Sequence, residues 1–137
     1  MVRIIIAAHG DMASHLLNCA ENLLGPTEGV SALNFMQHQS TGEIQAELKK
    51  RLESYGDDNV FILTDFLGGS PCNCACRFMD NDKVRIISGV NLPMLIEIMI
   101  KKEKLPPEKL CADVIKAARD SIEDVRAKFL KGSGLDI

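Results

Sequence analysis

The sequence predicts an α/β fold in three layers, with a mostly parallel four-stranded sheet in the centre and helices on both faces. Two observations favour this fold. Short runs of apolar, β-branched residues alternate four times with longer segments of helical periodicity. The runs also contain very few polar residues, which is typical of strands buried on both faces of a parallel sheet. Because parallel strands need a crossover between them, the intervening helices are expected to cover both faces.

The size and composition of the chain predict a single domain. The 137 residues are enough to bury a core, and no linker, repeat or low-complexity tract divides residues 1–137. The formal net charge is −3 with no basic cluster, which argues against nucleic acid or an anionic membrane as a partner. The N-terminal apolar run lacks the length and cleavage site of a signal peptide, and no stretch approaches the roughly 20 apolar residues of a membrane span. We therefore expect a soluble, cytoplasmic protein.

The first half of the chain is expected to form two strand–helix units. Residues 2–8 form the first strand, and Asp11 is expected to cap the helix that follows, which ends at Gly25-Pro26. Val30–Phe35 is a short second strand. The second helix opens with Ser40-Thr41-Gly42-Glu43, which has the Ser-x-x-Glu form of a capping box.

The second half is expected to add two strands and three helices. Residues 60–64 and 84–87 form the strands, and Ser70-Pro71 predicts a helix with Ser70 as its N-cap. Another helix is expected to start at Pro93 and to end near residue 100, before a break at Pro106-Pro107. A last, continuous helix is expected before Gly132. Its apolar face is formed by Leu110, Val114, Ala118, Ile122, Val125 and Phe129.

Two of the predicted strands end on polar residues that could carry chemistry. His9 follows the first strand, and Asp65 follows the third. In open α/β sheets, ligands bind where the strands end at their carboxyl side. If the two strands are neighbours, the carboxylate can hold one ring nitrogen of His9 and leave the other free as a nucleophile. Taken alone, Asp65 would be interpreted as a helix or turn cap.

The turn after Asp65 supplies a third candidate element, Gly68-Gly69-Ser70. Glycines let a ligand approach the backbone closely, and a helix N-terminus presents N–H groups to an anion. Ser70 can cap the helix or turn its hydroxyl toward a phosphoryl oxygen. As an isolated motif the segment is more often a plain turn, but beside His9 and Asp65 it predicts a phosphoryl-binding site. No Gly-x-Gly-x-x-Gly or Gly-x-x-x-x-Gly-Lys motif is present, and no cofactor is expected.

The remaining histidines and the clustered cysteines are given structural interpretations. Cys72, Cys74 and Cys76 occupy alternate positions, and no second cluster completes a zinc site. We interpret them as small, reduced helix residues. His15 and His38 are expected to be solvated, and they lack the spacing of a metal site with His9. No metal is expected.

Five motifs follow one another along nearly the whole chain. They are Ala8-His9-Gly10, Asn22-Leu23-Leu24-Gly25, Leu63-Thr64-Asp65, Gly68-Gly69-Ser70-Pro71 with Asn73, and Gly89-Val90-Asn91-Leu92-Pro93-Met94-Leu95. In this combination the chain resembles the IIA domain of mannose-type sugar phosphotransferase systems. Each motif alone is unspecific, whereas their order and spacing together are specific.

The resemblance implies a function and a set of partners. His9 would accept a phosphoryl group at Nε2 from the phosphohistidine of HPr and pass it to a IIB component, which serves the membrane components IIC and IID. The residue matching Asp65 holds the other ring nitrogen, and the residue matching Ser70 helps to bind the phosphoryl group. The family sheet is completed in a homodimer by an exchanged antiparallel strand. With the sequence ending at Ile137, we expect IIB to be a separate protein; the sugar is not specified.

Three alternatives remain at the level of the sequence. The phosphotransfer subunit of the dihydroxyacetone kinase system shares the fold and a histidine at this place, although Gly10-Asp11 and the Gly-Gly-Ser-Pro turn favour the mannose type. A non-catalytic interaction module of the same fold would need no nucleophile. A phosphoacceptor receiver is disfavoured because no acidic pair near the first strand could hold magnesium. Met12, Phe66 and Leu67 are expected either to form an apolar docking surface or to pack in the core.

Overall fold

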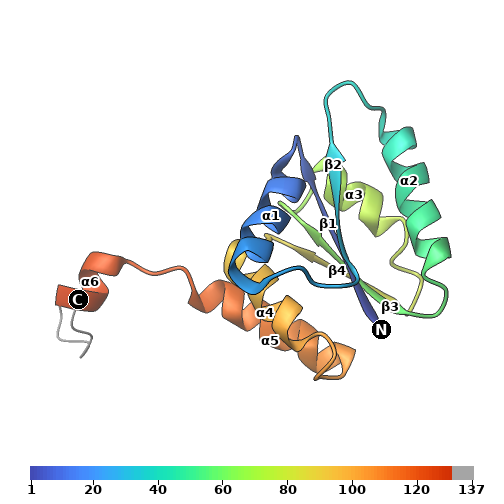
Figure 1. Ribbon diagram of the computed structural model, residues 1–137. Helices are drawn as coiled ribbons and strands as arrows, with labels where there is room; N and C mark the ends of the chain where they lie inside the picture. Colours follow the sequence, from blue (N-terminus) through green and yellow to red (C-terminus); the bar gives the residue numbers. More distant parts are fainter. Residues whose placement is uncertain (131–137) are drawn as a thin grey trace.

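The computed structural model describes residues 1–130, in which a four-stranded sheet lies between two layers of helices (Figure 1). The strands are β1 (Val2–His9), β2 (Val30–Phe35), β3 (Asn59–Thr64) and β4 (Val84–Ser88), in the sheet order β2-β1-β3-β4. The helices are α1 (Met12–Leu24), α2 (Thr41–Ser54), α3 (Ser70–Cys76), α4 (Leu92–Lys101), α5 (Pro107–Asp120) and α6 (Val125–Leu130). All three strand pairings are parallel, so the predicted α/β fold class is confirmed. Within residues 1–130, no helix has the length and hydrophobicity needed to cross a membrane.

The sheet separates two hydrophobic cores. Ile4 and Ile6 of β1 face the core under α1, α4 and α5, whereas Ile5 and Ala7 face the core under α2 and α3. All four side chains are fully buried, because successive residues of a strand point to opposite faces and both faces are covered. Each buried isoleucine contributes about 1.5–3 kcal/mol to folding. This two-sided burial explains the unbroken apolar runs in the middle of the central strands, residues 4–8 of β1 and 60–63 of β3.

The register of the central strands determines where their polar ends lie. In the β1–β3 pair, Ala7 is opposite Thr64, so His9 at the end of β1 and Asp65 just after β3 reach the same edge of the sheet. The loop that leads into α3 starts at this edge as well. The carboxyl edge of the sheet therefore gathers the polar residues that the sequence singled out.

Three helix starts can be compared with their predictions. Ser40 caps α2 as predicted, since its Oγ accepts a hydrogen bond from the backbone N–H of Glu43 at 3.1 Å. The predicted side-chain cap by Asp11 is wrong: Asp11 makes no capping bond to α1, and its carboxylate lies 3.2 Å from Nε2 of His15. Helix α4 starts one residue before Pro93, because Oδ1 of Asn91 accepts a hydrogen bond from the backbone N–H of Met94.

The predicted continuous last helix is also wrong. The segment forms two helices, α5 and α6, separated by residues 121–124. Oγ of Ser121 donates a hydrogen bond to the carbonyl of Ala118 at 2.6 Å, and Asn91 Nδ2 donates to the same carbonyl. Asp124 then caps α6, since its Oδ1 accepts from the backbone N–H of Ala127. These side-chain bonds replace helical ones, and α6 stands away from the body of the molecule (Figure 1). The predicted stop at Gly132 lies outside the described residues.

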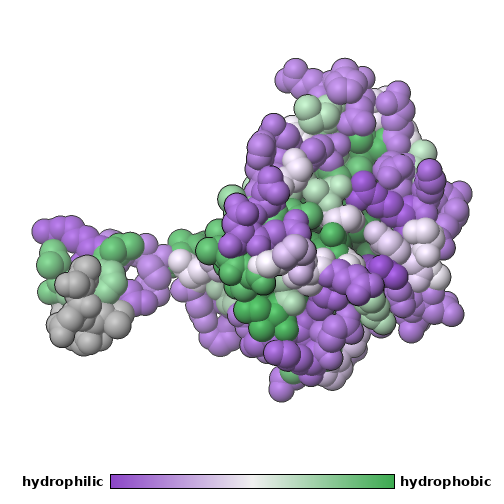
Figure 2. All heavy atoms as spheres, in the orientation of Figure 1, coloured by the Kyte–Doolittle hydropathy of each residue, from purple (hydrophilic) through white to green (hydrophobic). Residues whose placement is uncertain are grey.

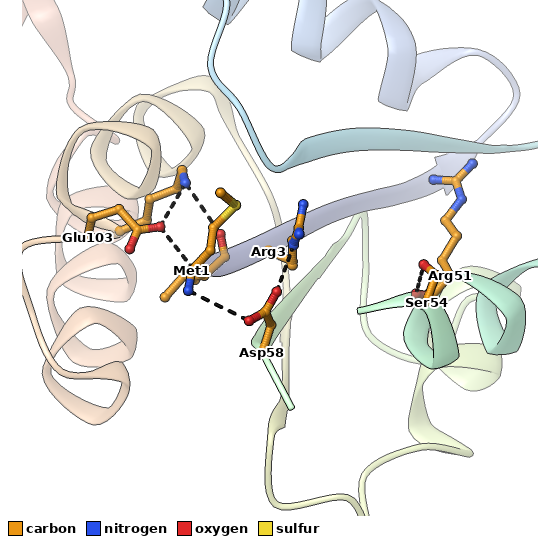
Figure 3. Close-up of polar contacts among 8 residues, drawn as sticks. Met1, Arg3, Arg51, Ser54, Asp58 and Glu103 are labelled. Atoms are coloured by element: carbon orange, nitrogen blue, oxygen red, sulfur yellow. Dashed lines mark hydrogen bonds and ion pairs between the residues drawn. The ribbon is translucent and has the colours of Figure 1, made fainter. Parts of the chain in front are cut away.

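Polar contacts hold the amino end of β1 at the opposite edge of the sheet (Figure 3). The Asp58 carboxylate accepts a hydrogen bond from Nε of Arg3 at 3.0 Å and lies 3.7 Å from the amino group of Met1. The hydrogen bond from Arg3 is the main cause of the lowered pKa of Asp58. Glu103 accepts a bond from the backbone N–H of Val2 at 2.9 Å. The strand that carries His9 at one end is thus held by several contacts at its other end.

Candidate functional site

The candidate site is built around the side chain of His9. This side chain is 47% exposed, whereas the carboxylate of Asp65 beside it is only 9% exposed. Oδ2 of Asp65 accepts a hydrogen bond from the backbone N–H of His9 at 2.9 Å and lies 2.7 Å from Nδ1 of the same residue. One carboxylate oxygen therefore holds both the backbone and the ring of His9.

The protonation of this pair follows from the hydrogen bonds of Asp65. Burial alone would raise the pKa of the Asp65 carboxyl, but the bonds donated by the His9 backbone, the His9 ring and the Phe66 backbone together hold that pKa below its ordinary value. An ionised carboxylate only accepts hydrogen bonds, so the ring proton of neutral His9 lies on Nδ1. The lone pair then lies on Nε2, at the side of the ring away from Asp65.

The loop after Asp65 is a tight turn that leads directly into α3. The N–H of Gly69 donates to the carbonyl of Phe66 at 3.4 Å, and Gly68 has a φ of +90°, as the third residue of a type II turn requires. Nδ2 of Asn73 donates to the carbonyl of Gly68 at 3.2 Å. The conformation of the turn is thus fixed by a glycine at its corner and by a side chain of α3.

Ser70 does not cap α3, contrary to the prediction. Gly69 occupies the N-cap position in an extended conformation, and Ser70 is already the first helical residue, followed by Pro71. No side-chain capping bond is formed at this helix start, and Ser70 is exposed. The hydroxyl of Ser70 is therefore available to a ligand.

His9 and Ser70 line one cavity of about 190 Å³, together with residues of β2 and of the N-terminal part of α2. His9 also lines an adjoining hollow of about 590 Å³ with Gly10 and His38. His38, which was predicted to lie in a solvated loop, is exposed and borders the same site as His9. His15 is exposed as well and is paired with Asp11.

Exposed apolar side chains surround the site. Met12, Met36 and Leu67 are exposed, and Phe66 is 54% exposed. The sequence left open whether Met12, Phe66 and Leu67 pack in the core, and the structure places all three at the surface. The ring of Phe66 stacks on the imidazole of His9, with 5.2 Å between the ring centroids and 15° between the planes. The contact was not predicted from the sequence, where its one signal is the position of Phe66 directly after Asp65.

The clustered cysteines lie on α3 and turn mainly toward the interior. Cys72 and Cys74 are buried and Cys76 is half-buried. Burial raises the pKa of the Cys74 thiol, which makes it a poor nucleophile. Within residues 1–130, no group of three or more His, Cys, Asp or Glu side chains is arranged to hold a metal ion.

Comparison with known proteins assigns the chain to a family. The family model described as "PTS system fructose IIA component" matches residues 3–115, and the chain belongs to this mannose-type IIA family of the phosphotransferase system. The resemblance inferred from the motifs is thereby confirmed. The parallel α/β fold described above is thus the fold of a phosphotransferase-system component.

Individual relatives agree with this assignment. The mannose-specific EIIAB component of Escherichia coli K12 is 33% identical over 133 residues, which cover 93% of this chain and 40% of that protein. The sorbose-specific EIIA component of Klebsiella pneumoniae is 31% identical over 112 residues, which cover 81% of this chain and 82% of that protein. The crystal structure of a PTS IIA protein associated with a fucose utilization operon from Streptococcus pneumoniae superposes with a TM-score of 0.84 at 30% identity, covering 93% of this chain and 95% of that chain.

Proposed function

We propose that this protein carries a phosphoryl group on Nε2 of His9, between phospho-HPr as donor and a IIB component as acceptor. The observation that supports the proposal most directly is the bond between His9 Nδ1 and Asp65, because it leaves the lone pair on Nε2 of an exposed ring. Membership of the mannose-type IIA family supports the choice of partners.

The transfer balances without a proton leaving the site. The lone pair of His9 Nε2 forms a bond to phosphorus, while the phosphorus–nitrogen bond of the donor phosphohistidine breaks and its electrons return to the donor imidazole. The proton on Nδ1 of His9 stays in its bond to Asp65, and the ring becomes positively charged. The Asp65 carboxylate stabilises that charge, and attack by the IIB histidine reverses these changes.

The Gly68-Gly69-Ser70 segment is proposed to bind the phosphoryl oxygens. Ser70 shares a cavity with His9, and its hydroxyl is not used for capping. The backbone N–H of Ser70, in the first turn of α3, lacks an intrahelical acceptor and can donate to an anion, whereas the N–H of Gly69 is donated to the carbonyl of Phe66. Phosphoryl transfer depends mainly on such positioning and charge stabilisation. No step of this scheme uses a metal or a cofactor.

The exposed apolar side chains around His9 are proposed to contact both partners in turn. Met12, Met36, Phe66 and Leu67 surround an exposed reacting atom, as expected of an apolar interface centre. We place the reaction in the cytoplasm, where IIB would pass the phosphoryl group on to a sugar brought in by the membrane components IIC and IID. The two curated relatives named above are specific for mannose and sorbose, which makes a sugar of this class the expected substrate of the whole system.

The test is phosphorylation of the purified protein with labelled phosphoenolpyruvate, enzyme I and HPr. We expect acid-labile label on the native chain and none on His9→Ala. His15→Ala is the matched control, since His15 is an exposed histidine near the site without a carboxylate on its Nδ1, and it should be labelled normally. An unlabelled native chain beside charged HPr would contradict the proposal and favour a non-catalytic interaction module; label on His9→Ala would assign the acceptor to another residue.

A further inference from the structure

We propose that Phe66 is a positioning residue, whose ring holds the imidazole of His9 in the orientation in which Nε2 can react. This inference rests on the proposed phosphoryl transfer through His9. The two rings are nearly parallel, with 15° between their planes and 5.2 Å between their centroids. Such an offset stack is a favoured geometry for aromatic pairs.

The loop holds the ring of Phe66 in place from its backbone. The N–H of Phe66 donates to Oδ1 of Asp65 at 3.0 Å, while Oδ2 of the same carboxylate binds His9. The carbonyl of Phe66 accepts from the N–H of Gly69, which closes the turn. The carboxylate therefore links the backbone of Phe66 to the ring on which Phe66 stacks.

Gly69 packs against both rings at once. A Cβ atom at this position would lie 2.8 Å from Cζ of Phe66, closer than real contacts allow, and 3.0 Å from Cε1 of His9, which is tighter than most real contacts. Gly69 has a negative φ that any residue adopts, so the backbone conformation alone does not require glycine here. The space for a side chain is taken up by the stacked pair, which shows that the two rings and the turn form one packed unit.

The imidazole needs this second support because the bond to Asp65 fixes only one edge of the ring. The side chain of His9 is 47% exposed, and a single hydrogen bond leaves the ring free to tilt about that bond. Stacking restricts the tilt and keeps Nε2 turned away from Asp65, on the exposed part of the ring. The aromatic face also attracts positive charge, which the imidazole gains as Nε2 binds phosphorus.

A role in docking alone would have a different kinetic signature. Phe66 and Leu67 are adjacent and both exposed, so each could contact a partner, but only Phe66 stacks on His9. Loss of a docking contact raises the KM for phospho-HPr, whereas loss of positioning lowers kcat. The neighbouring residue therefore provides the matched comparison.

The experiment measures kcat and KM for phospho-HPr in Phe66→Leu, Phe66→Tyr, Leu67→Ala and Met79→Leu. We expect kcat to fall about tenfold in Phe66→Leu, since a misplaced reacting group costs one to two orders of magnitude. Phe66→Tyr restores a ring and should retain most of kcat, and Leu67→Ala should raise KM alone. Met79→Leu, an exposed residue beyond the far end of α3, should change neither.

The NMR signals of the His9 ring protons provide a readout that does not depend on the donor. In the native protein and in Phe66→Tyr these signals should be shifted upfield by the stacked ring, and in Phe66→Leu the shift should be lost. Unchanged shifts, or an unchanged kcat in Phe66→Leu, would overturn the positioning role. So would a Phe66→Tyr variant as slow as Phe66→Leu. Failure of the native chain to accept phosphate would instead overturn the proposed function, and the NMR result would still decide whether the stack exists.

Discussion

At the scale of single residues, the site depends on what one carboxylate does for one imidazole. Oδ2 of Asp65 holds both the backbone N–H and Nδ1 of His9, and Oδ1 holds the N–H of Phe66. The lowered pKa of Asp65 means that these bonds are made to a charged acceptor, which makes them stronger than bonds between neutral groups. The Asp65 carboxylate therefore both orients the His9 ring and places a negative charge beside it.

The first prediction concerns Asp65→Asn. The amide oxygen can still accept a bond from His9, but the negative charge that balances the phosphorylated ring is lost. We expect the rate of phosphoryl transfer from HPr to fall about 10- to 100-fold, equivalent to the roughly 1.5–3 kcal/mol of a charged hydrogen bond. Stopped-flow or rapid-quench transfer measures this rate, with circular dichroism as the check on folding. An unchanged rate would remove Asp65 from the site.

The same variant should alter how stability depends on pH. Because the folded-state pKa of Asp65 is lowered from 3.8, its ionised form stabilises the fold at pH values above 3.8, and this contribution is lost as the pH falls through the lowered pKa. The difference in unfolding free energy between native protein and Asp65→Asn should therefore be constant near neutrality and shrink below pH 3.8. A difference that grows on acidification would contradict the assigned ionisation.

The sequence could predict the candidate residues of the site but not all of their contacts. His9 and Asp65 were predicted from their places at strand ends, because parallel strands bring those ends to one edge. The stacking of Phe66 was not predicted, because it depends on a turn whose shape is set by the φ of +90° at Gly68 and by the bond from Asn73. The direction of a loop side chain follows from such details and not from residue type.

At the scale of elements, the start of α3 decides what Ser70 can do. Its predicted role as an N-cap was inferred from the Ser-Pro pair, which usually marks the cap and first helical residue. In the structure, α3 begins one residue earlier than the Ser-Pro pair predicts. Gly69 is the N-cap, Ser70 is the first helical residue and Pro71 is the second. The difference of one residue frees the hydroxyl of Ser70 for the cavity beside His9.

The second prediction follows from this placement. Ser70→Ala should lower the transfer rate about tenfold, equivalent to one hydrogen bond to a charged group of about 1.5 kcal/mol. The free energy of unfolding should change by less than about 0.5 kcal/mol, because no cap is lost. Ser40→Ala is the matched comparison: Ser40 does cap α2, so its loss should cost about 1 kcal/mol. Urea unfolding of both variants measures these stability changes. A stability loss in Ser70→Ala without a rate defect would show that Ser70 stabilises the start of α3 and does not bind the phosphoryl group.

The boundaries of the other elements show where sequence patterns are sufficient. The buried strands were predicted because an unbroken apolar run such as that of β1 has few alternatives, and all of residues 4–8 are fully buried. The break between α5 and α6 was not predicted, since the apolar period continues through it. Bonds from Asn91 and Ser121 to the carbonyl of Ala118 end α5, and Asn91 belongs to a distant part of the chain. Such tertiary contacts are invisible to local periodicity.

At the scale of the whole molecule, one side of the fold has features of an interface. Among residues 1–130, β4 is an edge strand bonded to β3, and a cavity of about 390 Å³ lies beside it, lined by Ile86, Met94 and Ile122 among others. Hydrophobic side chains lie at the surface over α4 and α5 and again on α6 (Figure 2). Helix α6 has no buried residue, and Val125 and Leu130 are exposed on it.

The last prediction is that a second copy of the chain covers this side. An exposed helix without a buried residue gains no stability from packing, and an edge strand next to an apolar hollow is a ready pairing surface. The homodimer implied by the family resemblance, with a strand exchanged between subunits, would bury both. Sedimentation equilibrium should therefore give twice the chain mass of 15.0 kDa at micromolar concentration.

Two variants separate this surface from general hydrophobicity. Ile122 is 79% exposed at the proposed interface, and Leu23 is 63% exposed on α1. Neither residue is needed for the fold of one subunit, because both are largely outside its core. Ile122→Glu should shift the protein toward the monomer, since a carboxylate buried between subunits costs several kcal/mol. Leu23→Glu should stay dimeric. A monomeric native protein, or a dimer unaffected by Ile122→Glu, would contradict the proposed interface, because the substitution places a charge beside the cavity that the second copy must cover.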